Sequence, residues 1–252
     1  MGLSITPIHC GVLKDVERSS QQYLTGCGER IDVPLVMWLI LGGQRPVIVD
    51  VGAGPPDVVE EYQGRYLAQE KSPLDSLAAM GLTTADIGSV IITHAHWDHV
   101  LGLAALEFPQ AKIYIQRREL DFAVSPLPTQ RGLYQPRIVQ RLTTAAGNDE
   151  HQVVAVDGDR DIAPGVKMMH TPGHTPGTSA VLVQTPGGTF AIASDTVALR
   201  SSVRGPSFED WCPPGIHVDL AECYDSMQRL AQESILVLPS HDEAVFTRET
   251  YP

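Results

Sequence analysis

The sequence predicts a layered α/β domain, because segments with strand character alternate with segments with helix character along most of the chain. Short apolar runs indicate buried strands, and apolar residues spaced three and four apart indicate covering helices. Potential metal ligands follow several of the apolar runs directly, which is the usual place for a site on an α/β scaffold. With 252 residues and no evident linker or repeat, we expect residues 1–252 to form a single domain.

The first half of the chain begins with a polar and glycine-rich lead-in, and its first clear strand follows Pro34. The apolar runs at residues 35–41 and 47–51 predict two buried strands. The pattern then predicts helices near residues 58–67 and 74–80, and alternating strands and helices at residues 89–93, 100–106, 112–116 and 117–122.

The second half combines further strands with one amphipathic helix. Apolar runs predict strands at residues 153–156, 166–170, 180–184 and 189–193. The last helix is expected to bury one face, which carries Leu220, Cys223, Met227, Leu230 and Ala231. Two long irregular stretches, at residues 125–135 and 199–215, lie among the candidate ligands, so we expect them to be loops that line a site.

Three imidazoles and one carboxylate lie within six consecutive positions, directly after an apolar run that ends at Ile92. Side chains two apart in an extended chain point the same way, so His94 and His96 can bind one ion together. Asp98 and His99 follow where the chain turns toward a helix, and they can bind a second ion. These donors suit zinc and its first-row neighbours, whereas the lack of thiolates disfavours an iron–sulfur centre. The alternative is a surface turn that is rich in histidine by chance.

Three more candidate ligands follow later apolar runs. His174 lies in the turn Thr-Pro-Gly-His-Thr-Pro-Gly, Asp195 ends a run that begins at Phe190, and His241 ends a run that begins at Ile235. Such a recurrence of ligands at strand ends is harder to attribute to chance than any single motif. It favours a metal site built from distant parts of the chain.

These motifs occur in the order found in the metallo-β-lactamase-fold hydrolases, and the chain resembles that superfamily over nearly its whole length. The resemblance implies a four-layer αβ/βα sandwich with two divalent metal ions at one edge of its sheets. Zn²⁺ is the first expectation, and Mn²⁺, Co²⁺ and Fe²⁺ are the alternatives. The resemblance also implies that Asp50, in a Val-Asp-Val-Gly motif, supports the ligands without being one. The implied ligands are His94, His96 and His174 for one ion, Asp98, His99 and His241 for the other, and Asp195 as the bridge between them.

Within the superfamily, the chain resembles the N-acyl homoserine lactonases, but it departs from them at one position. Those enzymes typically carry a tyrosine three residues after the bridging aspartate, where this chain has Ala198. Either Tyr134 or the metal alone replaces the missing hydroxyl, or the substrate is a different lactone. A pyridoxolactonase-type enzyme, which opens a lactone fused to a pyridine ring, is therefore an alternative. Arg200 and Arg204 either hold a substrate carboxylate or are solvated.

The chemistry implied by such a site is hydrolysis. Two ions can share a water and lower its pKa from about 15.7 toward about 7, which supplies hydroxide to attack a lactone carbonyl. We expect Asp98 to carry the proton to the leaving oxygen. The chain has no Gly-x-Ser-x-Gly motif, which disfavours a serine acyl-enzyme. The alternatives are a glyoxalase-II-like thioesterase and, outside enzymes, a metal-binding sensing module.

The composition and net charge of the chain limit the kinds of partner that we expect. The net charge of −12 disfavours nucleic acid, which requires a basic surface. An anionic or carbonyl-bearing small substrate is compatible with it, because two divalent ions would make the site locally positive. The N-terminus has no signal-peptide pattern and no segment has membrane-spanning length, so the expectation is a cytoplasmic protein without a membrane partner. The four cysteines form no Cys-x-x-Cys pair and are expected to be free thiols. Pairing of two chains as a homodimer is left open.

Overall fold

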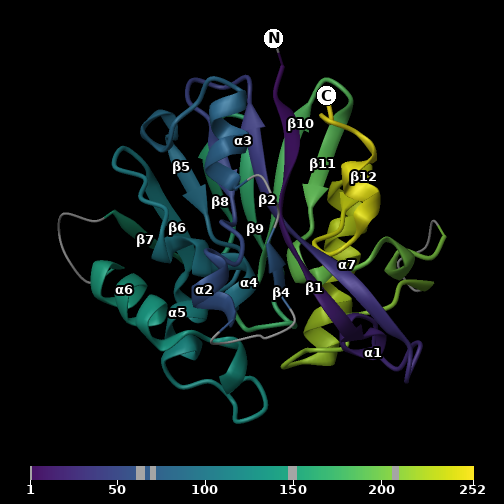
Figure 1. The fold of residues 1–252 in the computed structure, drawn as a ribbon. Helices are drawn as coiled ribbons and strands as arrows, with labels where there is room; N and C mark the ends of the chain where they lie inside the picture. The colour runs from purple at the N-terminus through teal and green to yellow at the C-terminus, as the bar shows by residue number, and fades with distance from the viewer. Residues whose placement is uncertain (1, 61–65, 69–71, 147–151, 206–209) are drawn as a thin grey trace.

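The computed structural model describes residues 2–60, 66–68, 72–146, 152–205 and 210–252. Two sheets pack against each other, and helices cover the outer face of each (Figure 1). The predicted four-layer α/β fold is thus confirmed.

The larger sheet has seven strands in the order β4-β1-β2-β3-β5-β6-β7. Strands β3, β5, β6 and β7 run parallel to one another, whereas the pairings of β4 with β1, β1 with β2 and β2 with β3 are antiparallel. Its strands are β1 (Ser4–Glu17), β2 (Arg30–Leu41), β3 (Val47–Val49), β4 (Tyr66–Ala68), β5 (Ser89–Ile91), β6 (Lys112–Gln116) and β7 (Val153–Val156).

The smaller sheet has five strands in the order β12-β11-β10-β9-β8, and its only parallel pairing joins β11 to β12. Its strands are β8 (Arg160–Ala163), β9 (Val166–His170), β10 (Ser179–Thr185), β11 (Gly188–Ile192) and β12 (Leu236–Leu238). The helices of the fold are α1 (Arg18–Gln21), α2 (Pro56–Glu60), α3 (Pro73–Ala79), α4 (Trp97–Val100), α5 (Arg117–Val124), α6 (Pro136–Ala146) and α7 (Leu220–Glu233).

The sequence of strand β2 is apolar without alternation because both faces of the strand are buried. Met37 and Leu39 face the helix side of the large sheet, whereas Trp38 and Ile40 face the smaller sheet. Successive side chains of a strand point to opposite faces, so a strand buried on both faces must be apolar throughout. The cluster between the sheets, which contains Trp38 and Ile40, is the central layer of the core.

The longer helices α5, α6 and α7 bury one face each. Leu120 of α5 and Ile138 and Leu142 of α6 pack on the large sheet, at the lower left of Figure 1. On the opposite side of the molecule, Met227 and Leu230 of α7 pack on the small sheet, as the apolar stripe of the last helix predicts. No helix among the described residues is both long and apolar enough to cross a membrane.

Several elements differ from the sequence prediction. The lead-in before Pro34 contains the 14-residue strand β1, whose polar and glycine content hides it and whose pairing with β2 is interrupted by two irregularities in register. Part of the helix predicted at 58–67 is found: α2 covers Pro56–Glu60, residues 61–65 lie outside the described part, and Tyr66–Ala68 forms a strand beside β1. Helix α6 and strand β8 were not predicted.

The helix predicted at residues 100–106 is instead α4 followed by a 3-10 turn, Leu101–Ala104. Gly102 lies very close to the loop after β3. A Cβ at this position would stand 2.0 Å from the Val51 carbonyl oxygen. Only glycine permits this approach. The turn therefore holds the His-rich segment tightly against the loop that follows β3.

The ligand-bearing loops leave the strands at one edge of the fold. In the large sheet the candidate ligands follow β5, and the supporting residue Asp50 follows the parallel strand β3. In the small sheet they follow β9, β11 and β12, which share one direction. The Ser179 amide donates to the Thr93 carbonyl across the two sheets at 3.0 Å. Carboxyl ends of parallel strands form the usual ligand site of α/β folds, and here two such edges meet.

Replacing Trp38 tests the packing between the sheets. Trp38 is 2% exposed, so Trp38→Ala should lower the free energy of unfolding by about 3–5 kcal/mol, because it removes a buried aromatic side chain and leaves a cavity. Chemical denaturation of the purified variants measures the effect. The control Val124→Ala changes a residue that is 67% exposed and should stay within about 0.5 kcal/mol of wild type. Equal stability of both variants would contradict the assigned core.

Candidate metal centre

All seven predicted ligand residues come together at this edge. His94 and His96 follow β5, and His174 lies in the turn between β9 and β10. Six of the seven are buried, and Asp98 is partly exposed. The structure places them in three overlapping groups whose potential ligand atoms lie within 4.8 Å of one another: His94, His96 and His174; His94, His99 and Asp195; and Asp98, His99 and His241.

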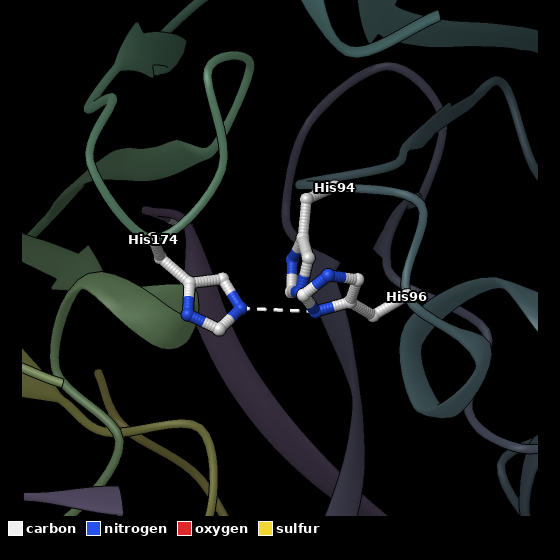
Figure 2. A group of neighbouring side chains, drawn as sticks. All are labelled: His94, His96 and His174. Carbon is white, nitrogen blue, oxygen red and sulfur yellow. Dashed lines mark hydrogen bonds between the residues drawn. The ribbon is translucent and has the colours of Figure 1, made fainter. Parts of the chain in front are cut away.

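The first group is built from both sheets. Figure 2 shows the rings of His94 and His96, which come from the loop after β5, facing the ring of His174. His174 Nε2 lies 3.0 Å from His96 Nδ1. The ring centroids of His94 and His96 are 4.5 Å apart. Three imidazoles thus converge from segments about 80 positions apart in the chain.

Asp195 lies between the two sides of the cluster. Its Oδ1 is 3.2 Å from Nε2 of both His99 and His241. Its Oδ2 is 3.4 Å from Nε2 of His174 and 4.0 Å from Nε2 of His94. Each carboxylate oxygen therefore faces different histidines, as expected of a carboxylate that can bind two cations at once.

The histidine nitrogens fit a metal ion better than a hydrogen-bonded core. Among the described residues, the buried Nε2 atoms of His94 and His96 have no hydrogen-bond partner. A buried polar atom without a partner costs about 1–3 kcal/mol, so two such atoms side by side need an explanation. A bound cation provides it, because a neutral imidazole nitrogen is a common metal ligand.

Hydrogen bonds on the far side of three rings aim their Nε2 atoms inward. His174 Nδ1 lies 2.7 Å from the Ile216 carbonyl oxygen, and His241 Nδ1 lies 3.0 Å from the Pro34 carbonyl oxygen. A carbonyl can only accept, so each Nδ1 carries the hydrogen and each neutral ring offers an Nε2 lone pair to the centre. His99 Nδ1 is held in the same way by a carboxylate.

That carboxylate belongs to Asp50, whose Oδ2 lies 2.8 Å from His99 Nδ1. Asp50 also accepts from the Thr93 amide and the Thr93 hydroxyl, both at 2.8 Å. The Thr93 hydroxyl in turn accepts from Ser194 at 2.7 Å. Asp50 and Ser194 both have positive φ, at 57° and 50°, which is uncommon outside glycine. The network that holds the ligands thus keeps two backbone positions in a disfavoured conformation.

Burial and nearby charged groups shift the pKa values of the histidines in opposite directions, which divides the histidines into two classes. Burial, together with the neighbouring imidazoles, lowers the pKa of His94 and His96 well below the usual value, so both are neutral and ready to bind. Burial also lowers the pKa of His99, but Asp195, Asp50 and Asp98 outweigh it and raise the pKa well above its usual value. The acids attract positive charge, which a bound cation can supply in place of a proton.

The same balance applies to Asp195. Burial alone would raise the pKa of its carboxyl, but His241, His99 and His174 outweigh burial and lower the pKa well below its usual value. The carboxylate is therefore ionised at the centre of the cluster. Its oxygens and those of Asp98, together with the imidazole nitrogens of the cluster, form a set of donors that suits a divalent cation of the zinc type.

The structure answers several open questions about other residues. The Tyr134 hydroxyl donates to Glu119 at 3.1 Å, and the Tyr134 ring lies edge-on to His96. Arg200 and Arg204 are exposed, and the Arg204 guanidinium donates to Ser201 and Thr25 on the surface.

Position 198 contributes its backbone to the centre. The Ala198 side chain is buried and carries no hydroxyl, and its carbonyl oxygen accepts from the His241 amide at 2.8 Å. Among the described residues, the four cysteines form no disulfide bond.

Glu119 is the contributor that the sequence did not reveal. It is a lone acidic residue in the first turn of an amphipathic helix, where a glutamate is common without any function. In the structure Glu119 is fully buried. It accepts hydrogen bonds from Ala95, which lies between His94 and His96, and from Thr175, which follows His174. Only its burial distinguishes it, and burial depends on how the loops fold over α5.

Over residues 32–241, the chain matches the Metallo-beta-lactamase superfamily. The chain belongs to that superfamily. The match spans the whole cluster, from the strand before Asp50 to the last candidate ligand, His241. The superfamily resemblance based on the motifs is therefore confirmed.

Curated relatives and solved structures agree with this placement. The chain is 26% identical over 230 residues to an N-acyl homoserine lactonase from Bacillus sp, covering 85% of this chain and 84% of the relative. It is 25% identical over 242 residues to an N-acyl homoserine lactonase from Bacillus cereus, covering 90% and 88%. A solved N-acyl homoserine lactone hydrolase, with N-hexanoyl-L-homoserine bound at its catalytic metal center, superimposes with a TM-score of 0.75 at 23% identity and covers 98% of this chain and 95% of its own.

Replacing Asp50 tests how the metallo-beta-lactamase centre holds His99. In Asp50→Asn, an amide N–H can face His99 Nδ1 and favour the tautomer whose hydrogen sits on Nε2, where it blocks a metal. We expect the affinity for Zn²⁺ to fall about 10- to 100-fold, as measured by competition with a chromophoric chelator.

Asp161→Asn, which changes an exposed aspartate in β8, is the matched control and should bind Zn²⁺ like wild type. An Asp50→Asn protein with wild-type Zn²⁺ affinity would show that Asp50 does not orient His99.

Proposed function

We propose that this protein is a dinuclear metal-dependent hydrolase that opens the ring of a lactone, most closely in the manner of an N-acyl homoserine lactonase. One observation carries the proposal: Asp195 lies within reach of histidines on both sides of the cluster. The relatives named N-acyl homoserine lactonase, which align over 85% and 90% of this chain, support the substrate class.

The proposed ligand sets follow the geometry. His94, His96 and His174 would hold one divalent ion, Asp98, His99 and His241 would hold the other, and Asp195 would contribute to both; the proximity of the potential ligand atoms supports these sets. Zn²⁺ is the proposed metal because its usual ligands are imidazole, carboxylate and thiolate, and the first two are present; Mn²⁺, Co²⁺ and Fe²⁺ also accept them.

When bound, the two ions would supply a water of lowered pKa and an electrophile for the carbonyl oxygen. The other tasks fall to the chain. Water adds across the ring C–O bond: its oxygen joins the acyl carbon, and its proton must reach the departing ring oxygen. We assign this transfer to Asp98. Two observations support the assignment: its side chain is 16% exposed, more than its partners at the centre, and its Oδ2 lies 3.5 Å from His241 Nε2.

Position 198 favours a second candidate function. Ala198 offers no hydroxyl, and the Tyr134 hydroxyl already donates to Glu119. A substrate that needs no hydroxyl at this position, such as the ring-fused lactone of a pyridoxolactonase-type enzyme, fits this arrangement. Thioester hydrolysis of the glyoxalase II type uses the same kind of nucleophile and is distinguished by a substrate test.

Metal content tests the dinuclear centre. The purified protein should contain close to two Zn²⁺, Mn²⁺, Co²⁺ or Fe²⁺ ions per chain by elemental analysis, after reconstitution if necessary. Asp195→Asn should lose metal and at least 100-fold of its hydrolytic rate, on the order of the loss seen when a catalytic group is removed. Full activity of Asp195→Asn would remove Asp195 from the bridge.

A substrate panel tests the reaction class. We expect ring opening of N-acyl homoserine lactones, simple γ-lactones or pyridoxolactone to exceed cleavage of S-lactoylglutathione in kcat/KM. Acid release by a pH indicator reports the lactones, and loss of thioester absorbance reports the thioester. Preference for pyridoxolactone would select the second candidate, and cleavage of the thioester alone would contradict lactonase activity.

A further inference from the structure

Glu119 lies in the first turn of α5, is fully buried, and belongs to none of the three groups of potential ligands. Its Oε1 accepts hydrogen bonds from the Ala95 amide at 2.9 Å and from the Tyr134 hydroxyl at 3.1 Å. Its Oε2 accepts from the Thr175 hydroxyl and from the Gly177 amide at 3.2 Å. Four donors on one carboxylate use most of its acceptor capacity, which accounts for its burial.

Two of the four donors stand next to proposed ligands in the chain. Ala95 lies between His94 and His96, and Thr175 directly follows His174. One carboxylate therefore joins the loop after β5, in the large sheet, to the turn after β9, in the small sheet. Each of the three histidines shown in Figure 2 has a neighbour in the chain that is bonded to Glu119.

A second observation shows that the turn rests directly on α5. A Cβ added at Gly177 would stand 2.3 Å from the Glu119 Cβ and 2.4 Å from the Glu119 backbone nitrogen. Any side chain at position 177 would push the turn away from the helix. The close approach at Gly177 and the hydrogen bonds to the Glu119 carboxylate thus both hold the turn after β9 against α5.

We propose that Glu119 is a positioning residue that sets His174 against His94 and His96, and so controls the affinity of one of the two metal positions. The inference rests on the proposed dinuclear centre. The other position, with Asp98, His99 and His241, receives its orientation from other groups, since Asp50 and the Pro34 carbonyl hold His99 and His241. Glu119 should therefore affect the two positions unequally.

The variant Glu119→Gln separates the two halves with little change in volume. An amide has one accepting oxygen and one N–H₂ group, so in either orientation it presents hydrogens to the Ala95 or the Gly177 amide. One of the two loops is then released. We expect the affinity of one bound Zn²⁺ to fall about 10- to 100-fold while the other keeps its wild-type value, as measured by chelator competition.

Ligand variants identify which position responds. In the His241→Ala background, which keeps the first histidine group, adding Glu119→Gln should weaken the remaining Zn²⁺ by the same factor. In the His174→Ala background it should leave the remaining Zn²⁺ unchanged. Asp121→Asn removes an exposed carboxylate from the same helix and is the matched control, with two Zn²⁺ bound as in wild type.

Thr175→Val provides a milder test if Glu119→Gln does not fold, because it removes a single bond to the carboxylate. It should shift the affinity of the same Zn²⁺ in the same direction by a smaller factor. Two Zn²⁺ bound with wild-type affinities, or both weakened equally, would overturn the positioning role. A wild-type protein that binds fewer than two Zn²⁺ would instead overturn the proposed dinuclear centre and this inference with it.

Discussion

Burial of the Asp195 carboxylate among imidazoles is the interaction on which the rest of the site depends. Its two oxygens lie 3.2–3.4 Å from the nitrogens of His99, His174 and His241. Removing an ion from water is costly unless opposite charge and hydrogen bonds compensate, so this carboxylate needs positive charge beside it. Ser240, which donates to Oδ1 at 2.7 Å, supplies only part of that compensation. Divalent cations would supply the remainder and would also relieve the unpartnered nitrogens of His94 and His96.

The same constraint explains the supporting network. Charged and polar groups held close together in a buried site must be oriented by hydrogen bonds, or each would turn toward its own best partner. Asp50 orients His99, backbone carbonyls orient His174 and His241, and Glu119 ties the two loops together. The positive φ angles of Asp50 and Ser194 show that this order is imposed at the expense of local backbone preference.

The family and the substrate rest on different parts of the chain. The candidate metal ligands lie within the segment that matches the metallo-beta-lactamase superfamily, and the chemistry proposed for them can act on many substrates. The choice of substrate depends on side chains around the centre, where Ala198 departs from the pattern expected of an N-acyl homoserine lactonase. The simplest interpretation of that departure is that the proposed substrate is a lactone with a different arrangement around its carbonyl.

The sequence alone determined the α/β class and the candidate ligands, because both depend on local patterns. Apolar runs mark buried strands, and a strand end followed by histidines and acids is visible without any knowledge of distant contacts. The motif order also indicated the superfamily. The single-domain organisation and the roles of the seven ligands stay predictions.

The tertiary structure decided what depends on pairing and close approach. Strand β1 is polar enough to resemble a loop and becomes a strand through its hydrogen bonds with β2, and β4 forms beside it for the same reason. Glu119 has an ordinary helix-start position in the sequence, and only the folding of two loops onto α5 gives it four donors. Contacts between residues far apart in the chain leave no periodic trace, so the network behind the ligands could be seen only in the folded molecule.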